Sequence, residues 1–416
     1  MTFALDATKS LWHGGKTVTG EERLSKSGVD TPGDLLSLIR SGEATTRGQL
    51  TEATGLARST VAQRVDALIS SGLVIEAGEA ESTGGRPPTI LGFNDNAGVV
   101  MAADFGATHS RIALTNLGGE TVIDRAVEID IDRGPEDVLG WLERAFDDLL
   151  VDSEHTAIDV KGIGVGLPGP VDFDRGMAVH PPIMAGWHEY PVADRLGRRF
   201  EVPVLVDNDV NIMALGEQWV MSPRIDDFIY LKVGTGIGSG LVLGGRIHRG
   251  AHGAAGDIGH VQSTNQSVVC KCGNTGCLEA AAGGAALAAQ LADSHEGVVG
   301  SRDVVRLVRE GRNDAARAVR EAGRLIGQVL ASTVNLLNPA LIIVGGDMAA
   351  AEQHLLAGIR EVVYRRSTAL STTDLQIMTS DLGDLAGVTG AAAMVIDHLL
   401  QPEAIAMAIA TSGGLA

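Results

Sequence analysis

The segment VVMAADFGATHSRIALTN, residues 99–116, predicts a strand, a glycine turn and a second strand. The segment FIYLKVGTGIGSGLVLGG, residues 228–245, has the same order of features, which indicates a weak internal duplication. A third strand runs into glycine in LIIVGGD, residues 341–347. Because strands alternate with helical patterns from Val99 to about residue 400, the sequence predicts an α/β protein over this range.

The composition limits the classes of protein to consider. The chain has 416 residues, of which 44% are apolar and 3% aromatic, and this length predicts several globular domains. No apolar run is long enough to span a membrane and no signal-peptide core stands at the start, so we expect a cytoplasmic protein with no membrane partner. The net charge of -19 argues against general polyanion binding, and the few aromatic residues argue against stacking on single-stranded bases.

Two glycine turns between strands are candidates for binding phosphate. GTGIGSG, residues 234–240, is followed by a strand instead of a helix, which excludes a Rossmann or Walker loop. Such a turn can still present backbone amides to phosphate, and in DFGAT, residues 104–108, the carboxylate is placed to hold Mg²⁺ through water. The alternative is that both turns serve only the fold. The nucleotide-binding candidates are Asp104, Gly106, Thr108, Gly234, Thr235, Gly236, Gly238, Gly345 and Gly346.

A sugar site is predicted at the end of another strand. In EVPVLVDNDVN, residues 201–211, polar residues follow a buried strand at its carboxyl end, where α/β sheets place their ligands. Asp209 is a candidate general base for a sugar hydroxyl, and Asn208 is a candidate hydrogen-bond partner for a neighbouring hydroxyl. The alternative is an Asx turn that caps the next helix.

The cysteines predict a metal site. All three lie in CKCGNTGC, residues 270–277, and His260 precedes them in GDIGH, so Cys270, Cys272, Cys277 and His260 offer four ligands to tetrahedral Zn²⁺. The alternative is ordinary reduced thiols. Four protein ligands leave no open position, so this zinc is expected to be structural and to fix the loop that carries Asp257 and Glu279. His248 and His252 are expected to be loop residues.

The first part of the chain predicts a winged helix-turn-helix. Helical patterns begin at Pro32, after Thr46 and at Ser59. Thr46 lies three residues before Gln49, as in a capping box, and Ser59 is expected to cap the third helix. Two predicted strands, LVIEAG and TILGF, then flank the polar loop ESTGGRPP.

Together, DFGAT, VGLPGPVD, VDNDVN, GTGIGSG, GDIGH and CKCGNTGCLE resemble the motifs of the ROK family (repressors, open reading frames and sugar kinases), over roughly Leu35 to Leu400. The resemblance implies an actin-like ATPase (ribonuclease H-like) fold of two lobes, with a sugar in the cleft between them. It also implies that five residues surround the sugar, with Asp209 at the position of the family's catalytic base and His260 shared with zinc. These sugar-binding candidates are Asn208, Asp209, Asp257, His260 and Glu279.

Three departures from the family's kinases bear on activity. Asp257 stands where the sugar-binding pattern usually has Glu, and Ala107 stands where kinases tend to have a second Gly, which adds a Cβ where the nucleotide would approach. HPPIMAGWHEYP, residues 180–191, keeps Trp187 but lacks the Asn that is typical of kinases just before it. These changes argue against phosphoryl transfer and leave a sugar pocket. The alternatives are an ATP-dependent sugar kinase, alone or bifunctional, that uses Mg²⁺ with Asp209 as base, and a non-catalytic scaffold for another protein.

The family's repressors have a Gly-Arg-Pro wing that resembles GGRPP here, which implies that Arg86 enters a minor groove. The third helix would meet the major groove or phosphates through Ser59, Thr60, Gln63 and Arg64. Residues 36–95 hold five Arg, no Lys and seven acidic residues, so non-specific binding should be weak and salt-sensitive. The alternative is a winged-helix module that contacts protein.

We therefore expect a sugar-responsive transcriptional regulator, acting as a repressor of carbohydrate metabolism genes. Two or four identical chains would bind operator DNA, and a monosaccharide or sugar derivative in the cleft would shift their conformation. The expected parts are a flexible arm over 1–31, the winged helix-turn-helix over 32–95, a first lobe over 96–215 completed by a C-terminal helix over 386–401, a second lobe with the zinc site over 216–385, and a loose tail over 402–416.

Overall fold

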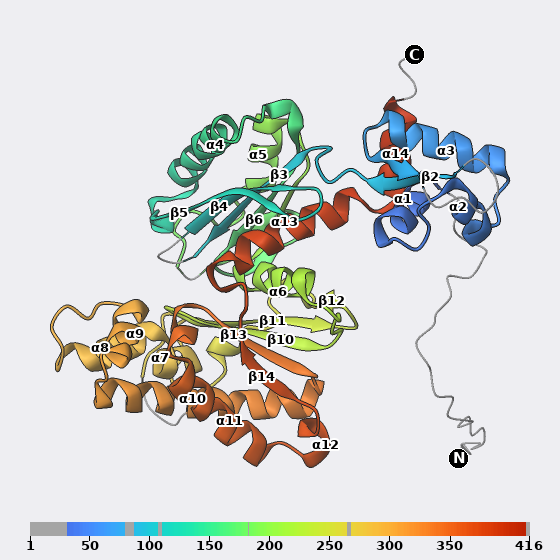
Figure 1. The fold of residues 1–416 in the computed structure, drawn as a ribbon. Helices are drawn as coiled ribbons and strands as arrows, with labels where there is room; N and C mark the ends of the chain where they lie inside the picture. The colour runs from blue at the N-terminus through green and yellow to red at the C-terminus, as the bar shows by residue number, and fades with distance from the viewer. Residues whose placement is uncertain (1–30, 80–86, 107–109, 182, 264–267, 413–416) are drawn as a thin grey trace, which may run out of the picture. The chain divides into compact units, whose positions relative to one another are not determined.

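The chain divides into two units, Met1–Gly92 and Phe93–Ala416, in a computed structural model that describes residues 31–79, 87–106, 110–181, 183–263 and 268–412. The first unit has the order α1 (Pro32–Ser41), α2 (Arg47–Thr54), α3 (Arg58–Ser70), β1 (Val74–Glu79) and β2 (Thr89–Phe93) (Figure 1). Strands β1 and β2 form a two-stranded sheet. The side chains of Leu35, Leu50, Val61, Val65 and Leu68 are fully buried and form the core of this unit. These elements confirm the predicted winged helix-turn-helix.

The starts of the helices in this unit are partly as predicted. Thr46 caps α2, because its side chain accepts a hydrogen bond from the backbone N–H of Gln49 at 3.2 Å. The Gln49 side chain, however, accepts from the N–H of Thr45, at 2.9 Å. The predicted cap at Ser59 is wrong: Ala57 is the capping residue, and its carbonyl accepts from the N–H of Val61. Its extended backbone already starts the helix two residues earlier, so Ser59 lies exposed in the first turn.

The second unit contains two five-stranded sheets with the same pattern. The first has the order β5-β4-β3-β6-β9, with β3 antiparallel to β4 and parallel to β6. The second has the order β12-β11-β10-β13-β14, with β10 antiparallel to β11 and parallel to β13. The hairpins β3–β4 and β10–β11 therefore occupy equivalent places, which confirms the internal duplication. The strands are β3 (Val99–Phe105), β4 (Ser110–Asn116), β5 (Thr121–Val127), β6 (Val160–Leu167), β9 (Val204–Asn208), β10 (Phe228–Val233), β11 (Ile237–Leu243), β12 (Arg246–Ile247), β13 (Leu341–Gly345) and β14 (Gln376–Thr379), besides the small hairpin β7 (Val171–Asp172) and β8 (Met177–Ala178).

Helices cover both faces of each sheet (Figure 1). On the first sheet, α4 (Pro135–Asp152) and α5 (Val192–Phe200) cover one face and α13 (Ala386–Leu399) packs on the other. On the second, α10 (Asn313–Leu337) and α11 (Glu352–Arg366) cover one face and α6 (Asp209–Val220) packs on the other. Helices α6 and α13 form the layer between the sheets, and a Cβ at Gly390 would lie 1.6 Å from the carbonyl oxygen of Ile212. Helix α13 thus packs on the first sheet as well as on α6.

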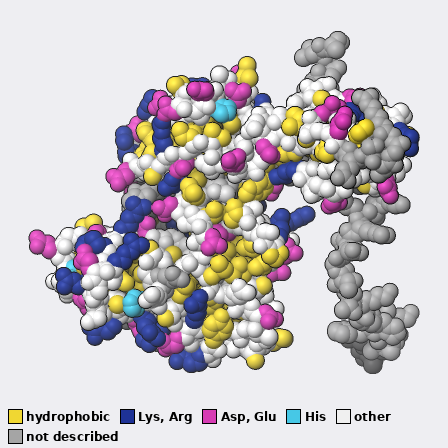
Figure 2. All heavy atoms as spheres, in the orientation of Figure 1, with side chains coloured by type: hydrophobic (Ala, Val, Ile, Leu, Met, Phe, Trp, Pro, Cys, Tyr) yellow, Lys and Arg dark blue, Asp and Glu magenta, His cyan; other side chains and the backbone are white. Residues whose placement is uncertain are grey.

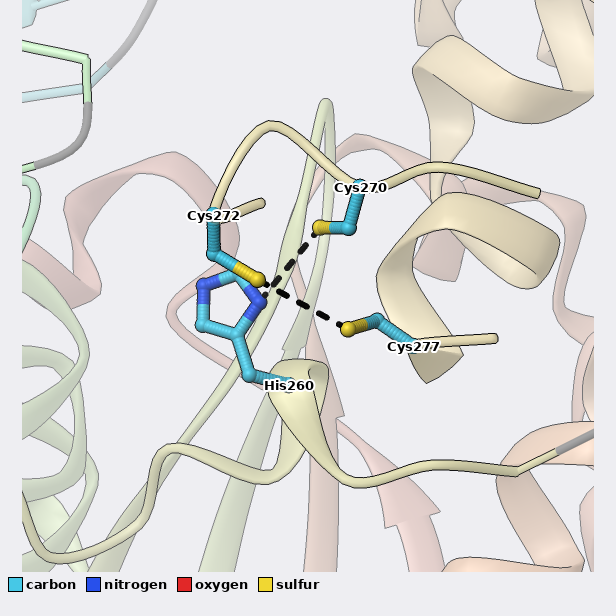
Figure 3. A group of neighbouring side chains, drawn as sticks. All are labelled: His260, Cys270, Cys272 and Cys277. Carbon is cyan, nitrogen blue, oxygen red and sulfur yellow. Dashed lines mark hydrogen bonds between the residues drawn. The ribbon is translucent and has the colours of Figure 1, made fainter. Parts of the chain in front are cut away.

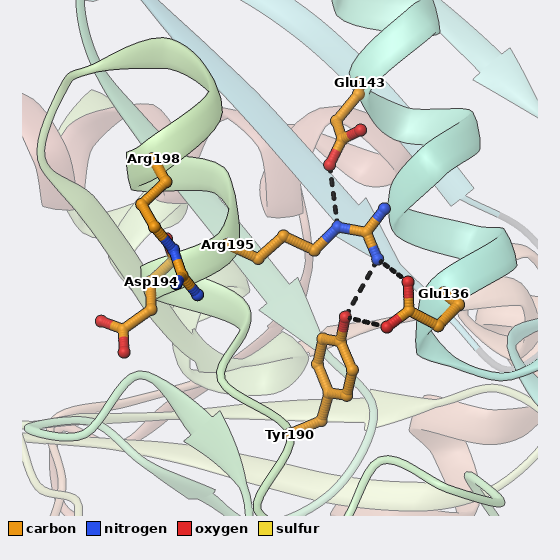
Figure 4. Close-up of polar contacts among 6 residues, drawn as sticks. All are labelled: Glu136, Glu143, Tyr190, Asp194, Arg195 and Arg198. Atoms are coloured by element: carbon orange, nitrogen blue, oxygen red, sulfur yellow. Dashed lines mark hydrogen bonds and ion pairs between the residues drawn. The ribbon is translucent and has the colours of Figure 1, made fainter.

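A polar network fastens α4 to α5 (Figure 4). The guanidinium of Arg195 donates to Glu143 at 2.8 Å and to Glu136 at 2.7 Å, and the hydroxyl of Tyr190 donates to Glu136 at 2.7 Å. The hydrogen bond from Tyr190 and the charge of Arg195 hold the pKa of Glu136 below its ordinary value. This network lies on the outer side of the first sheet and supports the fold, not the cleft.

The segment before β13 contains four helices, α7 (Leu278–Ala282), α8 (Gly284–Ala292), α9 (Ser301–Arg309) and α10. One expectation about the end of the chain needs correction. The expected loose tail is wrong over α14 (Pro402–Ser412), which proline starts and in which Ile405 is buried. Among the described helices, none is by itself long and apolar enough to cross a membrane, and one bent pair, Gly383–Leu399 with Pro402–Thr411, passes that test by length and composition only. The remaining short elements are α12 (Ala369–Thr372) and the 3₁₀ turns Ile131–Arg133, Ala157–Asp159, Ile258–His260, Asp347–Ala351 and Gly383–Leu385.

Candidate functional site

A cleft of about 1490 Å³ opens between the two sheets of the second unit. It is lined by all five predicted sugar-binding residues and by every predicted nucleotide-binding residue that the structure describes. Thr108 lies outside the described residues. The lining set thus includes Asn208, Asp209, Asp257, His260, Glu279, Asp104, Gly106, Gly234, Thr235, Gly236, Gly238, Gly345 and Gly346.

Asn208 caps helix α6, as the alternative interpretation of its motif proposed. Its side-chain oxygen accepts hydrogen bonds from the N–H groups of Val210, at 2.9 Å, and Asn211, at 3.2 Å. Its side-chain nitrogen donates to the carbonyl of Gly169 at 2.9 Å. These contacts fix the side chain at the edge of the cleft, and its contact with a sugar stays a prediction.

Asp209 starts α6 and is paired with a lysine that the sequence analysis did not single out. The Nζ atom of Lys232, on β10, lies 2.5 Å from Oδ2 of Asp209, and the aspartate side chain is only 6% exposed. Burial by itself would lower the pKa of Lys232, but the charges of Asp209 and Asp104 outweigh burial and raise it, so the lysine stays charged. The sequence signal was a single lysine within the otherwise apolar strand FIYLKV.

Asp104, at the end of β3, is buried in the floor of the same cleft. Burial raises its pKa to about 7, while the charge of Lys232 opposes the rise. Its Oδ1 atom has no hydrogen-bond partner among the described residues. On its other side it abuts α13, since a Cβ at Gly387 would lie 2.0 Å from Oδ2.

Glu279 of α7 contacts the glycine turn between β10 and β11. The carboxylate of Glu279 accepts from the N–H of Ile237 at 3.1 Å, and a Cβ at Gly236 would lie 2.2 Å from that carboxylate. The N–H of Gly234 donates to the carbonyl of Gly236 at 3.0 Å. Two amides at this turn are therefore already hydrogen-bonded within the protein.

The α9 side of the cleft carries both signs of charge. Figure 2 shows basic side chains gathered over the region of α8 and α9, with acidic side chains among them. Arg302 and Arg306 of α9 line the cleft, and they pair with Asp347 at 3.1 Å and Glu310 at 3.2 Å. Such exposed pairs contribute little stability, but they reduce the positive field that a phosphate would meet.

The four predicted metal ligands lie together (Figure 3). The imidazole nitrogen and the three sulfurs are all within 4.8 Å of one another, with Sγ of Cys272 3.7 Å from Sγ of Cys277 and Sγ of Cys270 3.6 Å from Nδ1 of His260. A zinc ion bonded at about 2.3 Å to sulfur would separate two sulfur ligands by about 3.8 Å. The donor set and its spacing therefore fit a tetrahedral metal ion.

Without a bound cation, the three thiols differ in the direction in which the protein shifts their pKa. Burial raises the pKa of Cys277 to about 12 and also raises the pKa of Cys270. The pKa of Cys272 is lowered, chiefly by a hydrogen bond from the backbone of Asn274. A bound cation is what would keep all three as thiolates.

Four predicted DNA contacts lie on α3. Ser59 and Gln63 are exposed, and Thr60 and Arg64 are half-buried. Arg86 lies outside the described residues. Arg58 is also exposed, in the first turn of the same helix, and was not among the predicted contacts.

Comparison with known proteins identifies the family. Residues 100–398 match the model of the ROK family, which is well over half of the chain. The chain belongs to the ROK family. Residues 30–75, ahead of the ROK match, match a winged helix-turn-helix DNA-binding model.

Relatives within the ROK family include both repressors and kinases. The xylose repressor of Caldicellulosiruptor bescii is 31% identical over 385 residues, which are 89% of this chain and 96% of that protein. The glucokinase of Halalkalibacterium halodurans is also 31% identical, but the match covers 70% of this chain and 92% of that enzyme. A solved ROK family transcriptional regulator, described as a homolog of the E. coli MLC protein, is 26% identical with a TM-score of 0.77 and covers 91% of this chain and 98% of that one. The repressor-like match thus extends over more of this chain than the kinase match does.

Proposed function

We propose that this ROK protein is a sugar-responsive transcriptional repressor of carbohydrate metabolism genes. The observation that carries the proposal is the union of a winged helix-turn-helix with a ROK cleft in one chain, matched over 89% of its length by a protein named as a xylose repressor. Two or four copies would place their α3 helices on repeated half-sites of an operator.

The DNA-binding end of the proposal rests on α3. Four predicted contact residues lie within two turns of this helix: Ser59, Thr60, Gln63 and Arg64. Ser59 and Gln63 are exposed, so their hydroxyl and amide groups can reach base edges. Arg47 is already paired with Asp66 at 2.9 Å, so it adds little charge toward phosphate. Affinity therefore depends on a few groups, repeated in each copy of the chain.

The cleft of the second unit would bind the effector. A monosaccharide or sugar derivative would be held by Asp209, Asp257, His260 and Glu279, with Asn208 at the edge. Because Nδ1 of His260 faces the thiols, its other ring nitrogen is the one that faces Asp257, whose Oδ1 atom lies 4.0 Å away. With Nδ1 bound to the metal ion, that other nitrogen would carry the ring proton and could donate to a sugar hydroxyl.

The metal would have a structural part in this arrangement. Zinc held by His260, Cys270, Cys272 and Cys277 would supply four bonds that fix the loop and the imidazole, with no open position for chemistry. It would join the turn that carries Asp257 to the start of α7, which carries Glu279.

A kinase function would keep Asp209 as its candidate base, but the residues that would bind the nucleotide give it little support. Asp209 is paired with Lys232, and two amides at the glycine turn are already hydrogen-bonded. The three sequence departures argue in the same direction.

Footprinting on DNA upstream of the chain's own coding region tests the proposal. We expect a protected site that changes when D-xylose, D-glucose or N-acetyl-D-glucosamine is added, with weaker protection by Gln63→Ala. A coupled assay for ADP formation with ATP, Mg²⁺ and the same sugars runs alongside. Sugar-dependent ADP formation without any protected site would replace the repressor with the kinase.

A further inference from the structure

The two equivalent hairpins of the duplicated fold carry opposite charges at the same position. In β3 the sequence before the turn is Asp104-Phe105-Gly106, and in β10 it is Lys232-Val233-Gly234. Asp104 pairs with Gly166 of the parallel neighbour β6, and Lys232 pairs with Gly345 of the parallel neighbour β13. Lys232 is therefore the structural counterpart of Asp104 in the second sheet.

Both side chains point into the layer between the sheets. On β10, Ile229, Leu231 and Val233 pack toward α10 and α11, so Tyr230 and Lys232 face α6. On β3, alternation likewise places Asp104 on the face opposite Phe105, toward α13, where it abuts Gly387. The start of α6 then brings Asp209 to within 2.5 Å of the ammonium group.

We propose that Lys232 is a built-in counter-cation of this cleft, which serves both Asp209 and Asp104 in place of a divalent metal ion and its nucleotide. An ammonium group on a strand cannot leave, and a second cation brought to the same two carboxylates would meet its repulsion. The cleft consequently holds its ligand without Mg²⁺ or ATP. This inference deepens the proposed function, because a repressor needs an effector site that does not depend on nucleotide.

The unpartnered oxygen of Asp104 supports this assignment. Oδ1 of Asp104 is buried, has no hydrogen-bond partner among the described residues, and belongs to a group that lines the cleft. Once it is ionised, above its pKa of about 7, a carboxyl group left in that state needs a nearby positive charge. Lys232 acts on it electrostatically while its hydrogen bond goes to Asp209. One lysine thereby serves two carboxylates, which a divalent ion would otherwise do.

The test is a titration of the zinc-loaded full chain with Mn²⁺ at a pH above 7, where Asp104 is ionised, alone and with ATP, in which free Mn²⁺ is followed by its paramagnetic resonance signal. We expect the natural protein to leave Mn²⁺ free. Lys232→Met should bind Mn²⁺ on the order of tenfold more tightly, because the repulsion is removed and two carboxylates remain. Adding Asp104→Asn to that variant should abolish the gain, and Lys232→Arg should behave as the natural protein.

Lys161→Met is the matched control, because Lys161 lies on β6 and does not line the cleft. Tight binding of Mn²⁺ or its ATP complex by the natural protein would overturn the proposal, and that measurement needs no variant to fold. A folded Lys232→Met chain that gains no Mn²⁺ would also overturn it. Neither result depends on DNA binding, so footprinting separates this failure from a failure of the proposed function.

Discussion

Arg249 forms an ion pair with the buried carboxylate of Asp207. The Nε and Nη2 atoms of Arg249 lie 2.8 and 2.7 Å from Oδ2 of Asp207, whose side chain is 1% exposed. The guanidinium also lies over the ring of Phe173, 3.8 Å from its centroid. Arg249 follows β12 of the second sheet and Asp207 lies on β9 of the first, so the pair joins the two lobes directly beside Asn208.

Replacing Arg249 by Met should strongly destabilise the second unit. The substitution would leave the charge of Asp207 buried without its cation, a change that typically costs about 3–5 kcal/mol. Unfolding in urea, followed by circular dichroism, should show a lower midpoint. Arg246→Met is the control, since Arg246 is exposed on β12 in the same segment.

The double variant decides whether the pair itself is responsible. Asp207→Asn together with Arg249→Met should cost less than the sum of the two single changes, because the buried charge has been removed. Additive effects would show that Arg249 stabilises the lobes through Phe173 alone.

Removing one thiol should release the metal. We expect about one zinc per chain in the natural protein and close to none in Cys272→Ser, because three remaining ligands do not complete the tetrahedral set. Metal analysis by mass spectrometry and the thermal midpoint measure the two effects, and the midpoint should fall. His252→Ala keeps both values, since His252 is an exposed loop residue outside the four-ligand cluster. A natural protein without zinc, or an unchanged midpoint in Cys272→Ser, would contradict the metal assignment.

The stability of the second unit should depend on pH through Asp104. Its pKa is about 7 in the folded chain and 3.8 in the absence of burial, so the folded state keeps a proton that the unfolded state releases. Stability therefore falls as the pH rises from the lower value to the higher one, by about 2–3 kcal/mol between about pH 5 and pH 8. Asp104→Asn should flatten this part of the profile. Asp293→Asn, at an exposed position, should leave the slope unchanged.

Local sequence signals predicted much of the site, and contacts between distant segments account for what they missed. The glycine turns, the cysteine cluster and the polar residues at the end of β9 are contiguous motifs, so their residue types and spacing predict their chemistry. Lys232 and Arg249 acquire meaning only when the fold brings them to Asp209 and Asp207, which lie 23 and 42 positions away. The error at Ser59 has a different cause, because backbone conformation at Ala57 set the start of α3 without a side-chain cap.

Two exposed residues of α3 are expected to contact DNA in different ways, Arg58 through a phosphate and Gln63 through base edges. Arg58→Ala should weaken binding about equally on all duplexes and reduce the slope of log K against log salt by about 1, if the exposed guanidinium contacts one phosphate. Gln63→Ala should cost about 1–3 kcal/mol of binding free energy on the operator alone and leave the salt slope unchanged, because an amide reads base edges and carries no charge.

Ser70→Ala, exposed at the other end of α3, is the control and should change neither quantity. Fluorescence anisotropy on operator and scrambled duplexes at several salt concentrations gives both. Equal losses from Gln63→Ala on both duplexes would mean that α3 does not read sequence, and the winged unit would then be a phosphate-binding or protein-contact module.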